Sequence, residues 1–396
     1  MTRLAVLASH PVQYYAPLFR ELVKHADLHV FYAHQASPAQ QAAAGFGTAF
    51  AWDVDLTEGY AHSFLHNVAR NPGTDRFSGC DTPEIGARLK EGQFNSVLAL
   101  GWHLKSMIQG ILAAKRLGMA TLVRGDSQLA TPRSQLKKLI KAATYPHLLR
   151  AFDAALCVGI HNRTYFEHYG YPSTRLFHSP HCIDTERFRK GATAEARAIL
   201  RNRFDIGEDE RVVLFAGKLL PFKRPLDIAA ALGMLLQQGK RYRLMVAGSG
   251  PLDQDLMQSA LALGIDLTLL GFQNQTEMPA AYGASDLLVL PSSGRETWGL
   301  VANEALACGL PIIVSDQVGC APDLAADGIV GRVFPVGDIR ALATAIEARF
   351  EAPTPTEAIK RLSEAHSIDA ACSGIKNALN FLMSTKMEKV SSSFVK

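Results

Sequence analysis

Short apolar segments rich in β-branched residues recur along this 396-residue chain, with helical periodicity between them. The first series of predicted strands covers residues 3–9, 28–33, 96–101, 120–125, 154–159 and 175–179. A second series covers residues 212–217, 243–248, 267–271, 286–291 and 311–315, with 331–335 as a sixth strand. Because strands that alternate with helices form parallel sheets, we expect an α/β chain with two Rossmann-like, doubly wound domains.

The junction between the two series lies between residues 188 and 210, where a turn containing proline leads into a helix rich in Arg and Ala. We therefore predict a first domain over residues 1–188 and a second domain over residues 189–365. Residues 366–396 are predicted to form a helix over 366–384 and a frayed polar tail. This helix either completes the second domain or crosses back to the first.

The composition excludes several classes of protein. Hydrophobic residues make up 48% and charged residues 20%, which argues against a disordered chain, a collagen or a coiled coil. The net charge of +4 is too small for nucleic-acid binding over the whole surface, so no nucleic-acid partner is expected. The six cysteines lack C-x-x-C spacing, and no signal-peptide core or 18-residue apolar run occurs. These features predict a cytoplasmic protein without a zinc site or a disulfide framework.

Basic residues are concentrated in the first half of the chain. Residues 1–150 contain 16 Lys and Arg against 10 Asp and Glu, and residues 103–150 contain nine basic residues and one acidic residue. That stretch is a candidate docking surface for an anionic partner. Its predicted helix carries Leu136, Leu139 and Ile140 on one face. Peripheral contact with an anionic inner membrane face is one interpretation, but we favour a helix packed on its own sheet with a solvated charged rim.

The most informative segment is PSSGRETWGLVANEALACGLPIIVSD, residues 291–316. It predicts a strand end, a loop of small residues, a helix that begins near Trp298 or Gly299 and ends at Gly309, and a further strand. Ligands of open parallel sheets bind beyond the carboxyl ends of the strands, so this loop lies where a ligand is expected. Unpaired amides and the helix dipole favour phosphate there, and Gly299 lets the backbone approach closely.

Two carboxylates accompany this helix start. Glu296 lies in the loop, and Glu304 lies about two turns along the helix, so one could reach a sugar and the other a ribose. The structural alternatives are an N-cap role for Glu296 and an exposed helix carboxylate for Glu304.

Three other predicted strand ends carry candidate ligand residues. FAGKLLPFKRPLD places Lys218 and Lys223 where two ammonium groups can face one pyrophosphate, with a solvated basic turn as the alternative. VAGSGPLDQ contains Gly248 in either a ligand loop or a structural turn. GFQNQTEM places Phe272 where its ring could meet a nucleobase.

With these motifs in order, the second half resembles the donor domain of the GT-B glycosyltransferases, specifically the large retaining family 4, or group 1. The resemblance runs from residue 212 to about 345 through G-K-x4-K-R-P, A-G-x-G-P, G-F-x-N-x-x-E-M and E-x7-E followed by A-L-A-C-G-L-P-I-I. It implies the GT-B fold, with two domains facing a central cleft, and a nucleotide-sugar donor.

The resemblance also implies roles for residues of the second half. Glu296 would contact sugar hydroxyls, Glu304 the ribose, and Lys218 and Lys223 the diphosphate. The family commonly has Arg at the first of these lysine positions, so Lys218 keeps the charge but loses the bidentate fork. The expected donor-binding residues are Gly217, Gly248, Phe272, Thr297, Trp298, Gly299, Leu300 and Glu304. The expected catalytic residues are Glu296, Lys218, Lys223 and Asp126.

The first half departs further from the family pattern. Where many members carry a Gly-Gly loop after the first strand, this chain has SHPVQYY, which makes His10, Gln13 and Tyr14 candidates for acceptor-side contacts. The alternative for His10 is a turn residue before proline. Where many relatives have a histidine after a middle strand, this chain offers Arg124 and Asp126, so the usual histidine role does not transfer.

No metal or other cofactor is expected. Lys218, Lys223 and the amides of residues 298–300 could stabilise the departing diphosphate without a cation. A DxD pair occurs at Asp53 and Asp55, but alternating polarity favours a solvent-facing strand there. The resemblance implies that the acceptor attacks on the face from which phosphate leaves, and a departing phosphate oxygen could then take the proton. Asp126 is a separate candidate for a helper base.

Together these features predict a retaining, metal-independent glycosyltransferase that moves a hexose-type sugar to a hydroxyl of a glycan or lipid-linked acceptor. One alternative is a nucleotide-sugar epimerase or hydrolase on the same fold, and another is a non-catalytic nucleotide-sugar-binding partner. A dinucleotide-dependent dehydrogenase is disfavoured because SHPVQYY lacks G-x-G-x-x-G. The base, the sugar, the acceptor and the linkage position stay open.

Overall fold

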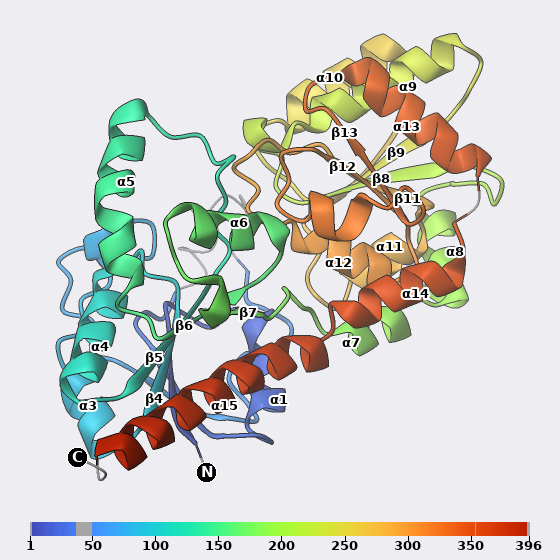
Figure 1. The fold of residues 1–396 in the computed structure, drawn as a ribbon. Coiled ribbons are helices and arrows are strands. Elements are labelled where there is room, and N and C mark those ends of the chain that lie inside the picture. Colours follow the sequence, from blue (N-terminus) through green and yellow to red (C-terminus); the bar gives the residue numbers. More distant parts are fainter. Residues whose placement is uncertain (1, 37–49, 353, 394–396) are drawn as a thin grey trace.

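Two parallel sheets of seven and six strands form two domains that lie side by side (Figure 1). The computed structural model describes residues 2–36, 50–352 and 354–393. All the strands predicted from the apolar segments are present, so the expectation of two doubly wound α/β domains is confirmed.

The first sheet has the strand order β3-β2-β1-β4-β5-β6-β7, and every neighbouring pair is parallel. Its strands are β1 (Arg3–Ala8), β2 (Asp27–Tyr32), β3 (Ala61–Phe64), β4 (Ser96–Leu100), β5 (Ala120–Gly125), β6 (Ala154–Cys157) and β7 (Leu176–His178). β3 was not predicted, because its sequence AHSF at the sheet edge is polar and only partly buried.

Helices cover both faces of this first sheet. α1 (Tyr15–Leu22) packs on one face, and α3 (Ile85–Glu91) and α4 (Lys105–Arg116) pack on the other. α6 (Ile160–His168) follows β6. Because both faces are covered, the central strands read as continuous apolar runs.

The second sheet has the order β10-β9-β8-β11-β12-β13. Its strands are β8 (Val212–Ala216), β9 (Arg243–Ala247), β10 (Asp266–Gly271), β11 (Leu287–Leu290), β12 (Ile312–Ser315) and β13 (Gly331–Phe334). Its covering helices are α9 (Pro225–Gln237), α10 (Asp253–Leu263), α11 (Met278–Gly283), α12 (Leu300–Ala307) and α13 (Ile339–Glu351). α12 begins and ends within two residues of the predicted limits.

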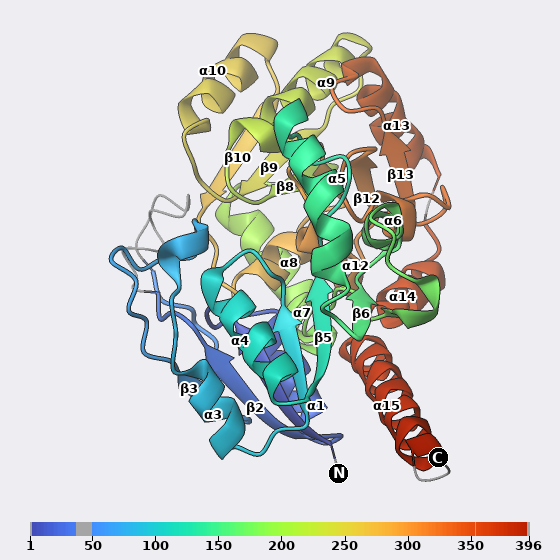
Figure 2. The same cartoon turned by 60° about the vertical axis from the view of Figure 1, so that its left-hand side comes forward.

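Four helices connect or span the two domains. α7 (Thr185–Gly191) and α8 (Ala194–Arg203) follow the first sheet but pack on α11 and α12 of the second domain. α14 (Thr356–Ala365) packs on α12, and α15 (Ile368–Ser393) then runs back to α1, β6 and β7 of the first domain (Figure 2). α15 continues beyond the predicted helix end at residue 384, since KMEKV has strong helix formers and no Pro or Gly to end the helix.

α5 (Gln135–Leu149) contradicts the packing that we favoured for it. Leu136, Leu139 and Ile140 are 67%, 69% and 53% exposed, and Leu149 is the fully buried residue of this helix. The sheet face near α5 is already covered by a cluster of Trp102, Phe152, Tyr165 and Phe166, which α5 reaches only through its C-terminal residues. The apolar face of α5 therefore stays open to solvent.

Asp53 and Asp55 are exposed, as predicted, but the strand predicted for them is wrong. Both residues lie in a loop. Asp55 accepts hydrogen bonds from the amides of Thr57 and Glu58, each at 2.7 Å, because a short carboxylate readily bonds nearby backbone and favours a turn. Asp53 instead accepts from Thr276 of the second domain, whose amide lies 3.0 Å away.

Candidate active site between the two sheets

A cavity of about 560 Å³ lies where the carboxyl ends of both sets of strands meet. It brings together most of the predicted site residues, namely Gln13, Tyr14, Asp126, Gly217, Lys218, Lys223, Gly248, Phe272, Glu296, Thr297, Trp298, Gly299, Leu300 and Glu304. His10 and Arg124 instead line a neighbouring cavity of about 330 Å³, and Asp126 lines both. We call the larger one the central cavity.

One end of the central cavity holds the two predicted lysines. Lys223 makes an ion pair with Glu296, whose carboxylate also accepts a hydrogen bond from Ser292 Oγ at 3.2 Å. Burial lowers the pKa of Lys218, and the positive charge of Lys223 lowers it further. Lys218 and Lys223 both line the central cavity, where a diphosphate would relieve the repulsion between their charges.

Glycines let the loops around these lysines approach closely. Gly248 has a φ of 147°, and a Cβ atom there would overlap the carbonyl oxygen of Gly217. The amide of Gly217 donates to the carbonyl oxygen of Ala247 at 2.9 Å, which ties the ends of β8 and β9 together. This contact leaves no room for a side chain between the loops.

The N-terminus of α12 faces the same cavity. The amides of Trp298, Gly299 and Leu300 have no hydrogen-bond acceptor within the part of the chain that the structure describes. Gly299 adopts a φ of 95°, and a Cβ there would lie 2.5 Å from Leu290 Cδ2. The Trp298 indole is buried and donates to Asn303 Oδ1 at 2.8 Å, so Trp298 offers the cavity its backbone.

Glu304 lies deep in the cavity wall. It is only 3% exposed, so the alternative of an exposed helix carboxylate is wrong. Tyr282 donates its hydroxyl to Glu304 Oε2 at 2.6 Å. Burial raises the pKa of Glu304 to about 7, although the Tyr282 hydrogen bond opposes the shift. The buried phenol of Tyr14, from the first domain, has its pKa raised by burial and by the nearby charge of Glu304.

Asp126 links the two domains across the cavity. Thr297 Oγ1 donates to Asp126 Oδ2 at 2.6 Å. His181 Nε2 lies 4.0 Å from the same oxygen and has no hydrogen-bond partner within the described residues. Burial, with a contribution from Arg124, lowers the pKa of His181 well below its ordinary value, so the ring is neutral at pH 7.

Sequence reasoning missed His181. The histidine lies three residues beyond β7, at the carboxyl edge of the first sheet. Ligands of parallel sheets bind beyond the carboxyl ends of the strands. This rule selected the loops of the second domain, and it applies equally to His181.

Aromatic residues from both domains close the other end of the cavity. The Phe272 ring lies 4.4 Å from the Phe50 ring, and Phe50 contacts Trp52 at 4.9 Å between centroids. Trp52 lines the cavity beside Phe272. Phe50 and Trp52 were not predicted as site residues, although two aromatic side chains in a polar loop are a signal for such a role.

Hydrogen bonds between the domains hold the cavity walls together. Gln128 Nε2 donates to the carbonyl oxygen of Glu296 at 2.9 Å, and Asn274 Nδ2 donates to that of Ala51 at 2.9 Å. The structure therefore has the two halves of the site in direct contact.

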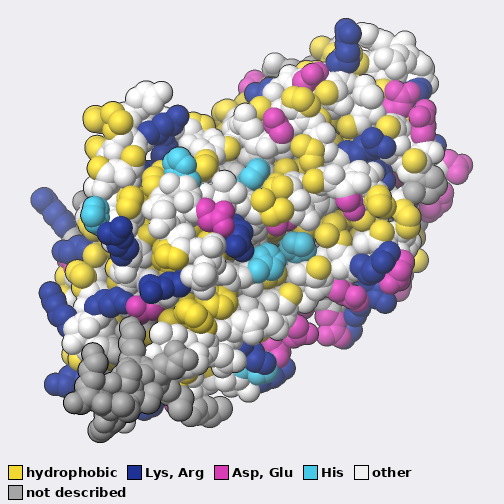
Figure 3. All heavy atoms as spheres, in the orientation of Figure 1, with side chains coloured by type: hydrophobic (Ala, Val, Ile, Leu, Met, Phe, Trp, Pro, Cys, Tyr) yellow, Lys and Arg dark blue, Asp and Glu magenta, His cyan; other side chains and the backbone are white. Residues whose placement is uncertain are grey.

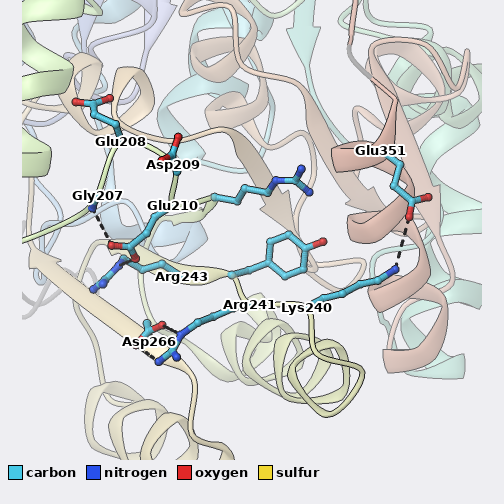
Figure 4. Close-up of a pocket in the computed structure, with 11 residues that line it drawn as sticks. Gly207, Glu208, Asp209, Glu210, Lys240, Arg241, Arg243, Asp266 and Glu351 are labelled. Carbon is cyan, nitrogen blue, oxygen red and sulfur yellow. Dashed lines mark hydrogen bonds and ion pairs between the residues drawn. The ribbon is translucent and has the colours of Figure 1, made fainter.

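A different pocket lies at the opposite, amino-terminal edge of the second sheet (Figure 4). Its charges pair with one another, since Arg241 lies 2.7 Å from Asp266 and Arg243 lies 2.9 Å from Glu210. None of the predicted site residues lines it. This pocket differs from the candidate active site because its charges are paired and because it lies at the amino-terminal edge of the sheet.

Comparisons with known proteins agree with this arrangement. Residues 196–366 match the family model for glycosyl transferases group 1. A GDP-mannose-dependent alpha-(1-6)-phosphatidylinositol monomannoside mannosyltransferase of Mycolicibacterium smegmatis is 30% identical over 71% of this chain and 74% of the relative. A D-inositol 3-phosphate glycosyltransferase of Saccharomonospora viridis is 37% identical over 41% of this chain, but the match spans only 39% of that relative.

Solved structures share the fold. HepE of Anabaena, in complex with UDP and glucose, has a TM-score of 0.70 at 15% identity. The alignment covers 96% of this chain and 100% of HepE. Sucrose-phosphate synthase of Thermosynechococcus elongatus has a TM-score of 0.71 at 17% identity, over 97% of this chain and 100% of its own. With two facing parallel sheets, the matched donor domain and a relative aligned over most of its length, the chain belongs to the group 1 glycosyl transferases of GT-B fold.

Proposed function

We propose that this glycosyltransferase moves a hexose-type sugar from a nucleoside diphosphate donor to a hydroxyl of a glycan or lipid-linked acceptor, with retention and without a metal ion. One observation carries the proposal. Lys218, Lys223 and the unpaired amides at the start of α12 converge on one side of a cavity whose other side carries Asp126. Cations and free amides in a confined volume are suited to a diphosphate that gains negative charge as it leaves.

Donor binding would rearrange the charges already present. In the structure Lys223 is neutralised by Glu296, so an incoming diphosphate would compete for the ammonium group and release the carboxylate toward the sugar hydroxyls. Glu304 at the far wall would take a ribose hydroxyl, and Phe272 would pack on the base.

The transfer itself needs one bond to form as another breaks. The acceptor oxygen bonds to the anomeric carbon on the face from which the diphosphate oxygen departs, and the lysines and amides stabilise that oxygen. The acceptor proton goes to the departing phosphate oxygen, with Asp126 as a helper base. Asp126 is suited to this because the Thr297 hydrogen bond holds its carboxylate at the junction of the two cavities, with the neutral His181 ring 4.0 Å away.

The names of similar proteins suggest the first donors to test. The mannosyltransferase relative is named for GDP-mannose, and HepE was solved with UDP and glucose. We therefore propose GDP-mannose and UDP-glucose as the donors to compare first.

We also propose peripheral contact with an anionic inner membrane face on the cytoplasmic side, through α5. Its exposed face combines Leu136, Leu139 and Ile140 with the exposed Lys137 and Lys138, and apolar and basic side chains lie together at its free end (Figure 3). Such a face favours the boundary of an anionic bilayer. Within the described residues no helix has the length and apolar character needed to span a membrane.

The test of the transferase proposal is a product analysis with the full chain. Donor turnover that persists with a chelator, and a product of unchanged anomeric configuration by NMR, are the expected results. An inverted product would disprove retention, and loss of activity on chelation that magnesium restores would disprove metal independence. Epimerised donor, or nucleoside diphosphate released without acceptor dependence, would favour the epimerase or hydrolase. Donor binding unaffected by Glu296→Gln, without turnover on any acceptor, would indicate a binding partner.

A further inference from the structure

The smaller cavity beside the central one is strongly basic. It lies at the carboxyl ends of β1, β4 and β5 and is lined by two histidines, two arginines and one lysine, namely His10, His103, Arg124, Arg133 and Lys141. The single carboxylate among its lining residues is Asp126. We call this the basic cavity.

Arg124 is buried without a counter-ion. It is 1% exposed, and its guanidinium donates to the carbonyl oxygens of Ser179 and Pro180 at 3.2 and 2.7 Å. No carboxylate lies within 4.0 Å of it in the described ranges. Removing a charge from water is costly unless an opposite charge or several good hydrogen bonds replace the solvent, and carbonyl dipoles leave the net charge in place.

Arg133 and Lys141 are partly buried cations of the same cavity. Within the described residues Arg133 Nη1 makes two long hydrogen bonds, at 3.4 and 3.3 Å, to the carbonyl oxygens of Gln128 and Thr131. Lys141 Nζ donates to the Tyr165 hydroxyl at 2.8 Å and lies 4.3 Å from the centre of the Tyr145 ring. Neither cation has an ion pair within the described part of the chain. Burial lowers the pKa of Lys141, which agrees with a charge that lacks a partner.

Asp126 lines the basic cavity but makes no ion pair with these cations within the described residues. Its carboxylate accepts from the Thr297 hydroxyl and faces His181, on the side of the central cavity. The basic cavity therefore has an excess of positive charge directly beside Asp126, the proposed helper base. In the pocket of Figure 4, by contrast, Arg241 and Arg243 each have a carboxylate partner.

We propose that the basic cavity binds an anionic group, a phosphate or a carboxylate, that belongs to the acceptor and places its hydroxyl at Asp126. This inference rests on the proposed transferase function and names the class of its acceptor. Arg133 and Lys141 contact the anion, while Arg124 adds a fixed positive charge at the inner wall. The rings of Trp102 and Tyr145 line the same cavity and provide an apolar surface for the sugar or cyclitol that carries the anion.

The test measures binding to the full chain by calorimetry in the presence of UDP, with glucose 6-phosphate, glucuronate and uncharged glucose as probes. At least one anionic probe is expected to bind roughly tenfold more tightly than glucose, and more weakly as salt is added. The preferred probe identifies a phosphate or a carboxylate. Displacement of glucose 6-phosphate by phosphatidylinositol vesicles, but not by phosphatidylcholine vesicles, would place the phosphate on a lipid.

Variants then assign the effect to this cavity. Lys141→Met and Arg133→Gln are each expected to remove most of the preference for the anion, while Lys138→Met, an exposed lysine of the same helix outside the cavity, leaves it unchanged. Equal affinity for glucose and both anions, or an equal loss in Lys138→Met, would overturn the proposal. UDP binding in the same titrations separates the two failures, because a chain that binds UDP but not anions loses only this inference. If UDP does not bind, the titrations are repeated with GDP, and failure to bind either nucleotide counts against the transferase proposal instead.

Discussion

The two domains hold their charged groups at the cleft in opposite ways. In the second domain Lys223 is paired with Glu296, and Glu304 accepts a hydrogen bond from Tyr282. In the first domain Arg124 and Lys141 have no carboxylate partner within the described residues. The charged groups of the donor half thus compensate one another until a diphosphate binds. The acceptor half instead has an excess of positive charge that a bound anion would offset.

The largest test of this contrast is Lys223→Met. It removes a cation from the leaving group and leaves Glu296 without its ion pair, so kcat/KM is expected to fall about 10²–10³-fold. Steady-state kinetics with the preferred donor measures the loss. The matched control is Lys240→Met, a lysine at the opposite edge of the same domain that pairs with Glu347 and Glu351. An equal loss of kcat/KM in Lys240→Met would contradict the different roles assigned to the two edges of the second sheet.

A second test concerns how tightly the donor loops pack. Gly248→Ala is expected to lower the free energy of unfolding by about 2–4 kcal/mol, because the new Cβ meets the Gly217 carbonyl and φ is positive. Gly239→Ala also has a positive φ, of 77°, but open space around the Cβ, so about 1 kcal/mol is expected. Denaturant unfolding compares the two variants, and equal losses would show that the close approach is unimportant.

The internal balance of the donor half also predicts a pH dependence. The pKa of Glu304 is raised to about 7, so the native state holds a proton that the unfolded chain releases at lower pH. The contribution of Glu304 to the free energy of unfolding is therefore fully present below the ordinary glutamate pKa. It decreases by roughly 2–3 kcal/mol as the pH rises toward 7. Unfolding curves of the wild type and Glu304→Gln across that range measure the difference. An unchanged slope in the variant would contradict the assignment to Glu304.

The smallest expected effect concerns the surface of the acceptor half. Replacing Leu136 and Leu139 with Ser is expected to weaken binding to anionic vesicles about tenfold, because two exposed apolar side chains are lost. Vesicle sedimentation measures the change. Leu261→Ser provides the control, since this leucine is 84% exposed on α10 of the other domain. Equal weakening in the control, or none in the double variant, would argue against α5 as the contact surface.

The sequence predicted much of the donor half, and for a clear reason. Lys218, Gly248 and Glu296 each follow a recognisable strand, and the carboxyl ends of parallel strands meet at one edge. Their grouping in one cavity needs no knowledge of side-chain packing. The exposed face of α5 could not be predicted in the same way, because periodicity shows that a helix has an apolar face but not whether the sheet beside it is already covered.

What the sequence determined by itself was the order of strands and helices and the loops that bear ligand residues, since local periodicity reports which positions are buried. Only the tertiary structure decided which side chains meet across the chain. Asp53 bonds to Thr276, Gln128 bonds to Glu296, and His181 lies beside Asp126. These contacts, and the lack of carboxylate partners for the cations of the basic cavity among the described residues, depend on how distant segments pack, and no local pattern in the sequence encodes that.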